Sequence, residues 1–443
     1  MEVKSFVGGA HIPHYKSFTE KLPITKMSVP KELIIPLLQH SGAICEPLVS
    51  VGDKVAAGQK IGESTEYISA PVHASVSGIV SAIEPRPCYD GGKVMSIVIE
   101  TDQQVQEFEC GEKRDPSKMS VEELKECIKE AGIVGMGGAA FPTHVNINTA
   151  TPIDSLLLNG AECEPFLTCD HRQMVERADD MIAGAEIIMR IIGATKCYAG
   201  IEVNKPDAIE AVNSRIQGRT DIEVVPLAVK YPQGFKSHLI KAVTGRDVPR
   251  GARSSALGCI VRNVGTTIAS YEAVVYGKPS IERVVTVSGP NVPKPGNYIV
   301  KIGTPIGHLL KECGVEDLDG FKVIVGGPMT GVAQNNLDAP IVKSNTGLLV
   351  LPPDMVWQDE AYSDCVRCGK CVDHCPVYLY PNQLSIYAES GMLVAAEKCD
   401  IMDCIECGIC SFYCPANRPI VHFIQRVKPQ VNKMQRERSK KIS

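Results

Sequence analysis

Two stretches near the C-terminus, DCVRCGKCVDHCPVYLY (residues 364–380) and DCIECGICSFYCPANRP (residues 403–419), carry one and the same cysteine spacing. Each contains Cys-x-x-Cys-x-x-Cys-x-x-x-Cys-Pro. Three thiolates at i, i+3 and i+6 on a tight loop can bind three corners of one iron–sulfur cube, and the fourth, after a longer spacer, points to the other cube. The repeat therefore predicts two [4Fe–4S] clusters that exchange their fourth ligands.

The predicted ligands divide into two sets. Cluster one takes Cys365, Cys368, Cys371 and Cys414, and cluster two takes Cys404, Cys407, Cys410 and Cys375. Zinc is the alternative, because four-cysteine zinc sites also use Cys-x-x-Cys. Zinc needs only two such pairs, whereas each run here has four cysteines and a trailing proline. The segment resembles a bacterial two-cluster ferredoxin, which implies electron transfer between neighbouring cubes.

The composition describes an ordinary multidomain protein with unusual cysteine content. The 443 residues are 44% hydrophobic and 22% charged, a length that predicts two to four domains. A net charge of −5 and a single Trp give no pull toward nucleic acid. No run approaches the ~18 to 20 apolar residues of a membrane span, and the N-terminus lacks the apolar core of a signal peptide. We expect a cytoplasmic chain whose 18 cysteines serve metal binding and buried packing rather than disulfides.

Residues from about 28 to 100 are predicted to be β-rich. Short apolar runs alternate with glycines at turn spacing in EPLVSVGDKVAAGQKIGE (residues 46–63) and APVHASVSGIVSAIE (residues 70–84). This pattern resembles the barrel-sandwich domains that carry biotin or lipoyl groups. Because no lysine occurs between Lys60 and Lys93, a carrier role is not expected, and a structural or docking barrel is the prediction.

The middle of the chain predicts an α/β layer. SVEELKECIKEAG (residues 120–132) has a capping box, Ser120 with Glu123, and a glycine stop. After it, strand-like runs at 155–162, 197–203 and 222–229 alternate with helical runs at 174–192, 206–216 and 235–243, which favours a mainly parallel sheet. Residues 284–353 then look like a β-grasp module, with strands around one helix.

Two further motifs carry chemistry. In GIVGMGGAAFPTH (residues 132–144), Gly135, Gly137 and Gly138 would let the backbone approach a phosphate or a flat ring, although a glycine-rich structural turn is the alternative. In LLLNGAECEP (residues 156–165), a strand ends in Asn159, Glu162 and Glu164, and ligands of open α/β sheets bind where strands end. Exposed loop charges are the alternative for the two glutamates.

Taken together, the glycine loop, Asn-Gly-Ala-Glu-Cys-Glu-Pro, the β-grasp and the terminal cysteine runs resemble the C subunit of the Rnf complex, over essentially the whole chain. That family is related to the flavin-bearing subunit of respiratory complex I. The resemblance implies bound FMN, an NAD(H) site stacked upon it, and electron exchange with the two clusters. It implies the NAD-side subunit of a membrane-bound ferredoxin:NAD+ oxidoreductase coupled to Na+ or H+ export. The subunit would sit peripherally on the cytoplasmic face, and would receive ferredoxin electrons through other subunits, one of them ferredoxin-like.

The resemblance also implies roles for individual residues. Gly135, Gly137 and Gly138 line the flavin and its phosphate, Phe141 lies near the nicotinamide or adenine, Asn159 and Glu162 contact the flavin, Glu164 contacts the dinucleotide, Gln233, Gly234 and Lys236 form a second flavin loop, and Asn263 and Thr266 lie on the phosphate or ribityl side. The chain departs from the pattern at Asn146, where related sequences usually carry Lys. The phosphate charge must then be met by backbone N–H groups, Lys236 or Arg262.

Two rival functions remain at this stage. A soluble flavin/iron–sulfur cobalamin reductase shares most modules, but there the flavin motif is expected near the N-terminus rather than after a barrel. An electron-transfer scaffold subunit without dinucleotide binding is the second rival. The predicted domains are an arm and barrel (1–112), an FMN/NAD-binding α/β domain (113–283), a β-grasp (284–353), a dicluster domain (354–425) and a basic tail (426–443). The tail is expected to be a frayed terminus, with docking to an acidic partner or membrane surface as the alternative.

Overall fold

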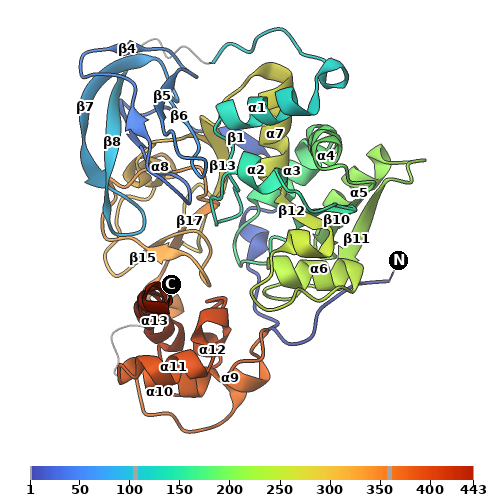
Figure 1. Cartoon of the computed structure of the whole chain (residues 1–443). Coiled ribbons are helices and arrows are strands. Elements are labelled where there is room, and N and C mark those ends of the chain that lie inside the picture. Colours follow the sequence, from blue (N-terminus) through green and yellow to red (C-terminus); the bar gives the residue numbers. More distant parts are fainter. Residues whose placement is uncertain (1, 103–107, 357–361, 443) are drawn as a thin grey trace.

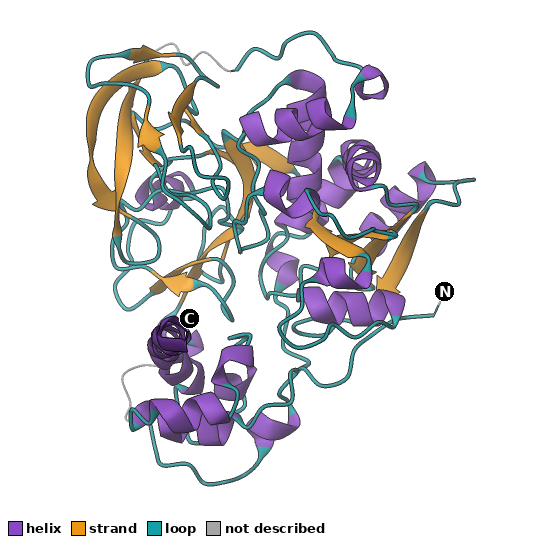
Figure 2. Cartoon of the chain, viewed as in Figure 1, coloured by secondary structure: helices purple, strands orange, loops and turns teal. Residues whose placement is uncertain are grey.

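The computed structural model describes residues 2–102, 108–356 and 362–442, which fold into four packed units (Figure 1). A β-rich unit lies at the upper left of the view, an α/β unit at the right, a mixed sheet between them, and a helical lobe below. Figure 2 shows the strands gathered in the upper units and the lower lobe built of helices.

The first unit is a sandwich of two small antiparallel sheets. One sheet has the order β2 (Glu32–Pro36), β8 (Lys93–Thr101), β7 (Gly78–Pro87), β4 (Lys54–Val55), and the other has β3 (Glu46–Pro47), β5 (Lys60–Glu63), β6 (Val72–His73). Alternating apolar side chains such as Leu33, Ile61 and Ile99 are fully buried between the sheets.

The α/β unit contains a four-stranded parallel sheet, as the alternation predicts. Its order is β11 (Ile222–Leu227), β10 (Lys196–Glu202), β9 (Ser155–Gly160), β12 (Cys259–Asn263). Its helices are α1 (Val121–Glu130), α2 (Thr143–Ile147), α3 (Cys169–Glu176), α4 (Ala178–Ile192), α5 (Pro206–Arg215), α6 (Lys236–Thr244) and α7 (Val264–Tyr276). The capping box of α1 is confirmed, with Ser120 and Glu123 each accepting from the other's backbone N–H.

The single helix predicted over 174–192 is wrong. The chain leaves the helical conformation at Arg177 (φ −130°, ψ 32°), so that α3 and α4 are separate. The guanidinium of Arg177 binds Asp180 at 2.8 Å and Glu272 of α7 at 3.0 Å, and this pairing holds the break against the neighbouring helix.

The third unit is a six-stranded mixed sheet with one helix, α8 (Ile306–Glu312). Its order is β1 (Ile24–Lys26), β14 (Gly296–Lys301), β13 (Glu282–Ser288), β17 (Gly347–Leu351), β15 (Lys322–Val325), β16 (Val332–Ala333). The edge strand β1 comes from the N-terminal arm and pairs in parallel with β14, which the sequence patterns did not predict.

The helical lobe contains both cysteine runs and the end of the chain. Its helices are α9 (Lys370–Asp373), α10 (Pro381–Glu389), α11 (Leu393–Lys398), α12 (Ile409–Phe412) and α13 (Ile420–Ile442). The expected frayed tail is wrong, because α13 continues through it and buries Val427 and Val431 against the lobe. Two of its cations are paired within the lobe, Lys428 with Glu406 and Arg438 with Glu397.

The N-terminal arm connects three of the units. Lys4 exchanges backbone hydrogen bonds beside β11, Ala10 pairs with Tyr231, and the Gly9 N–H donates to the His374 carbonyl of the helical lobe. Farther along, the buried ammonium of Lys16 donates to the Glu164 carbonyl at 3.0 Å. The arm therefore belongs to the packing of the α/β unit and the lobe as much as to the sandwich.

Short 3₁₀ turns complete the element order. They lie at Lys16–Phe18, Pro116–Lys118, Ser254–Leu257, Pro353–Met355 and Ile401–Asp403.

Candidate functional site

The glycine loop after α1 forms a closed turn with exposed backbone. The Gly135 N–H donates to the Phe141 carbonyl at 2.9 Å, and the Ala140 N–H donates to the Gly135 carbonyl at 3.2 Å. Gly138 takes a φ of +119°, which L side chains rarely adopt. A Cβ on Gly137 would lie 3.3 Å from Cβ of Asn263, so the absence of side chains keeps this face open.

The carboxyl ends of β9 and β12 bring the predicted polar residues together. Asn159 and Asn263 are register partners on these adjacent strands. The Asn159 amide donates to the Gly234 carbonyl at 2.8 Å, and the Asn263 side chain caps α7 by accepting from the Thr266 N–H. The Thr266 hydroxyl in turn accepts from the N–H of Met136 in the glycine loop at 2.8 Å. The predicted positions on these strands and loops therefore surround one site, although their cofactor contacts stay predictions.

Buried polar atoms without partners lie next to this network. Gln233 is fully buried, and neither its amide nitrogen nor its amide oxygen has a hydrogen-bond partner among the described residues. The Nε of the buried Arg262 is likewise without a partner in the described part of the chain. Such groups are costly unless something binds them. A polar cofactor edge fits this wall of the site.

Two cationic side chains, those of Arg262 and Lys236, lie close enough for their charges to interact. Burial lowers the pKa of Arg262 to about 10, and burial together with the charge of Arg262 lowers the pKa of Lys236, the first residue of α6. Neither has a carboxylate partner within 4.0 Å in residues 2–102, 108–356 and 362–442. Two cations with no counter-charge fit a phosphate, which meets the need created by Asn146 on α2.

A pair of acidic residues, Glu162 and Asp170, adjoins the network at Asn263. Both oxygens of Glu162 accept from backbone N–H groups that start α3, those of Asp170 at 2.7 Å and His171 at 3.1 Å. Burial, followed by the charge of Glu162, raises the pKa of the Asp170 carboxyl to about 7, and the Asn263 amide donates to that carboxyl at 2.6 Å. The ligand-type atoms of Glu162, Cys169 and Asp170 lie within 4.8 Å of one another, but the backbone N–H groups occupy Glu162, so we assign no metal there.

Sequence reasoning missed Asp170. The available signal was an acid directly after the LTC segment (residues 167–169), at the start of a helix that follows the strand-end loop. Its contact with Asn263 depends on β12, which lies about ninety residues away and which the strand predictions did not include.

Glu164 is held by the mixed sheet. Its carboxyl accepts from the Met329 N–H at 3.1 Å and from the Thr330 hydroxyl, and burial raises its pKa. The loop that carries Glu164 is therefore fixed between two units. Its contact with a dinucleotide, and that of Phe141, stay predictions.

The eight cysteines gather around two cavities in the helical lobe. One cavity is lined by Cys404, Cys407, Cys410 and Cys375, and the other by Cys365, Cys368, Cys371 and Cys414. Each cavity thus takes three cysteines from one run and one from the other, the grouping that the crossover predicts. Burial raises the pKa of the Cys407 thiol to about 12.

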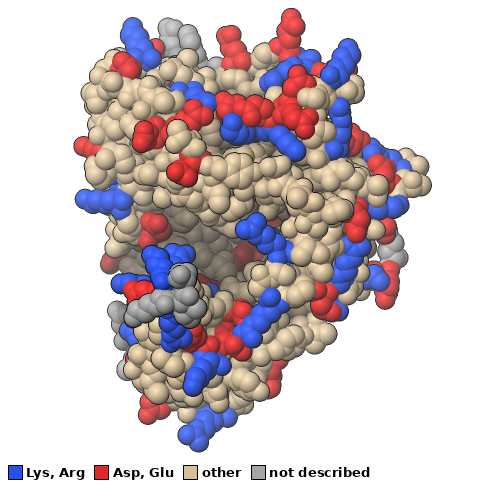
Figure 3. All heavy atoms as spheres, viewed as in Figure 1, with Lys and Arg blue, Asp and Glu red and all other residues tan. Residues whose placement is uncertain are grey.

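Both cysteine runs contact the loops beside the strand-end site. The Tyr231 hydroxyl donates to the Cys407 carbonyl at 2.9 Å, and the Gly234 N–H donates to the Cys163 thiol at 3.4 Å. The ring of His238 lies 3.1 Å from the Pro376 carbonyl, directly after Cys375. The space-filling view shows the surface hollowed between the lobe and the units above it (Figure 3).

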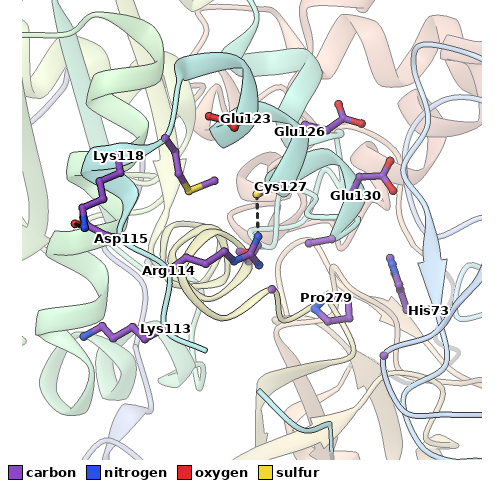
Figure 4. Close-up of a pocket in the computed structure, with 15 residues that line it drawn as sticks. His73, Lys113, Arg114, Asp115, Lys118, Glu123, Glu126, Cys127, Glu130 and Pro279 are labelled. Carbon is purple, nitrogen blue, oxygen red and sulfur yellow. Dashed lines mark hydrogen bonds and ion pairs between the residues drawn. The ribbon is translucent and has the colours of Figure 1, made fainter. Parts of the chain in front are cut away.

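A larger cavity, of about 860 Å³, lies elsewhere, beside α1 (Figure 4). Its wall includes His73 of the sandwich, Glu126 and Glu130 of α1, and Arg114, whose guanidinium donates to the Cys127 thiol at 3.4 Å. None of the twelve predicted flavin and dinucleotide residues lines it. The chemistry therefore concentrates at the strand ends rather than in this cavity.

Four family models match successive parts of the chain. They are the RnfC barrel sandwich hybrid domain (residues 4–104), the Nuo51 FMN-binding domain (128–272), the SLBB domain (284–333) and the 4Fe-4S dicluster domain (364–418). The predicted fold class is confirmed, as are FMN and two iron–sulfur clusters as its cofactors, and NAD(H) stays a prediction. The molecule is a flavin and iron–sulfur electron-transfer protein. The domain boundaries drawn from the sequence stay predictions.

Curated relatives align over nearly the full length. The chain is 45% identical to the C subunit of the proton-translocating ferredoxin:NAD(+) oxidoreductase complex of Clostridium ljungdahlii, over 99% of this chain and 96% of that protein. It is 41% identical to the C subunit of the Na(+)-translocating complex of Acetobacterium woodii, over 97% of this chain and 98% of that protein. The chain belongs to the family of C subunits of ion-translocating ferredoxin:NAD(+) oxidoreductase complexes, the RnfC family.

A solved structure shares the fold. An NAD+-reducing [NiFe]-hydrogenase in the H2-reduced state superimposes with a TM-score of 0.51 at 22% identity, over 70% of this chain and 63% of that chain, which is less than two thirds of its length. Among the described residues, no helix is both long and apolar enough to cross a membrane.

Proposed function

We propose that this chain is the NAD-side subunit of a membrane-bound ferredoxin:NAD+ oxidoreductase coupled to Na+ or H+ translocation. The observation that carries the proposal is the contact between the strand-end site and the second cysteine run, through Tyr231 and Cys407. The relatives from Clostridium ljungdahlii and Acetobacterium woodii, whose names state this reaction, support it.

Different residues bind different parts of the cofactors. Lys236 and Arg262 hold the flavin phosphate, and the glycine loop lets its backbone approach the cofactor. Gln233 and Asn159 hydrogen-bond the polar edge of the ring, while Glu164 orients the dinucleotide. Bound FMN supplies the exchange between the hydride of NADH and single electrons that iron–sulfur clusters carry. The protein stacks the two rings and excludes water.

The same proposal places the chain in a complex. The ion path belongs to other subunits, and this chain attaches peripherally at the cytoplasmic face. Electrons from ferredoxin reach it through a neighbouring iron–sulfur subunit. Cys368 is exposed in the first cysteine run, and that run is the entrance.

The test is anaerobic reduction of the purified chain, reconstituted with FMN and iron–sulfur clusters, by NADH. Flavin absorbance and low-temperature EPR are followed together. Flavin bleaching with new cluster signals is the expected result, because it requires one path from NADH through FMN to the clusters. If NADH reduces cob(II)alamin without ferredoxin while the clusters stay oxidised, the cobalamin reductase is favoured. Absence of saturable NADH binding would favour the scaffold subunit.

A further inference from the structure

Two loops at one end of the sandwich meet the glycine loop. We call them the tip loops and define them as residues 40–45 and 64–71. The Ser41 hydroxyl donates to the Ala139 carbonyl at 3.0 Å, and the Ser41 N–H donates to the Ala140 carbonyl at 3.1 Å. Ala70 packs in one buried cluster with Ala140 and Val134. One serine therefore binds two consecutive carbonyls of the loop that the proposed function assigns to flavin.

The glycine loop needs this support. Ala140 has a φ of +47°, a left-handed conformation that costs on the order of 1 kcal/mol or more for a residue with a Cβ. Strain of this kind persists only where surrounding contacts hold it. The two Ser41 bonds act at Ala139 and Ala140, whereas Thr266 of α7 binds the loop at Met136. The loop is therefore held both by α7 and by the sandwich.

The tip loops are themselves braced. The His40 ring lies 3.0 Å from both the Ser69 hydroxyl and the Ala43 carbonyl, so the two loops are joined. The Ala43 N–H donates to the Ile68 carbonyl at 2.9 Å. Ser41 is thus presented by a rigid base rather than by a loose loop.

A second contact holds the helix that follows the glycine loop. The Tyr67 hydroxyl accepts from the Asn148 amide at 2.8 Å, directly after α2, and the ring of Tyr67 meets His144 edge-on. Farther back, the buried Lys343 ammonium donates to the carbonyls of Pro71 and Gly132 at 2.7 and 2.8 Å. The sandwich therefore holds the glycine loop through Ser41 and the segment after it through Tyr67, and Lys343 of the mixed-sheet unit joins Pro71 of the sandwich to Gly132 before the loop.

We propose that the barrel sandwich is a positioning element for the flavin site, with Ser41 as its main positioning residue. The proposal rests on the proposed function, since it assigns the domain to the same loop. In the carrier domains that this sandwich resembles, the hairpin between the two halves presents a lysine. Here the corresponding hairpin carries Tyr67 and Ala70 in its loop. Their contacts help to hold the glycine loop in the conformation that accepts the cofactor.

The test compares three variants of the full chain: Ser41→Ala, Ser41→Thr and the control Ser81→Ala. Ser81 is matched, because its hydroxyl also donates to a carbonyl, that of Val98 at 3.4 Å, but within the sandwich itself. FMN affinity is measured by fluorescence quenching on the flavin-free chain, and hydrogen exchange is measured for the amides of residues 135–141. We expect Ser41→Ala to weaken FMN binding about fivefold and to speed that exchange by a similar factor, as for one lost hydrogen bond. Ser41→Thr keeps the hydroxyl and should restore both.

The outcomes separate the two proposals. If Ser41→Ala matches Ser81→Ala in both measurements, the positioning role is overturned. If the unaltered chain binds no FMN, the proposed function fails, while exchange at residues 135–141 still decides whether Ser41 holds the loop. Unchanged exchange with weakened FMN binding would also overturn positioning, because it would make Ser41 a direct contact.

Discussion

The two cysteine runs have the same spacing but different surroundings. In the second run, Ile409 is 1% exposed, the Cys407 carbonyl accepts from Tyr231, and Gly408 packs against the Met329 carbonyl. In the first run, Val366 is 64% exposed and Cys368 is exposed as well, and the end of that run contacts other units through His374 and Pro376. We call the second run the inner run and the first the outer run. The repeated cysteine spacing predicts the same kind of cluster ligands in both runs. The packing of the helical lobe against the other units then gives the two runs different neighbours.

The largest expected effect breaks the pairing between the runs. Cys414→Ala should remove the cluster of the outer run, so that about half of the iron is lost. Its EPR spectrum should match that of Cys365→Ala and differ from that of Cys404→Ala. Cys399→Ala, outside both runs, serves as the control. A spectrum that matches Cys404→Ala would refute the crossover.

A second experiment tests whether Lys236, which follows the Tyr231 loop in the chain, binds the flavin phosphate. Lys236→Gln should weaken FMN binding about tenfold, because a charge-assisted bond to phosphate is lost, and should leave riboflavin binding unchanged. Lys241→Gln is a matched control on the same helix, where the lysine pairs with Asp247. Equal weakening of both flavins would mean that Lys236 does not bind phosphate. Both affinities are read from flavin fluorescence.

A smaller effect is expected from Tyr231→Phe. The variant leaves the Cys407 carbonyl without its donor, a loss of about 1 kcal/mol. Hydrogen exchange should rise severalfold at residues 404–410 and stay unchanged at 365–371. The control is Tyr362→Phe, whose hydroxyl donates to Glu389 on the outer side of the lobe. If hydrogen exchange changes equally in the two runs, Tyr231 does not stabilise the inner run specifically.

The smallest effect is expected at the surface. Arg250 of the α/β unit forms ion pairs with Asp400 and Asp403, just before the inner run. Because the pair is exposed, Arg250→Ala should loosen the lobe only slightly, and the difference from the unaltered chain should vanish at high salt. Limited proteolysis at low and high ionic strength measures this. A large effect that persists in salt would show that the contact holds the lobe by more than charge.

The sequence predicted elements whose signals are local. The capping box at Ser120, the parallel strands and the cysteine spacing each depend on residues a few positions apart. The wrong predictions have a different cause. The break at Arg177 depends on Glu272 of another helix, and the ordered end of α13 depends on burial of Val427 and Val431 against the lobe. The pairing of β1 with β14 joins residues more than 270 positions apart, which no local pattern contains.

The sequence by itself predicted the iron–sulfur ligands and the glycine loop, because cysteine spacing and glycine backbone freedom are properties of short covalent segments. It also determined, through the combination of motifs, the family. Only the tertiary structure decided that the Gln233 amide and the Nε of Arg262 are buried without a hydrogen-bond partner among the described residues. It also decided that the inner run lies against Tyr231 and that Ser41 holds the glycine loop. These contacts join residues far apart in the chain, and they form because separately folded units bury apolar surface against one another.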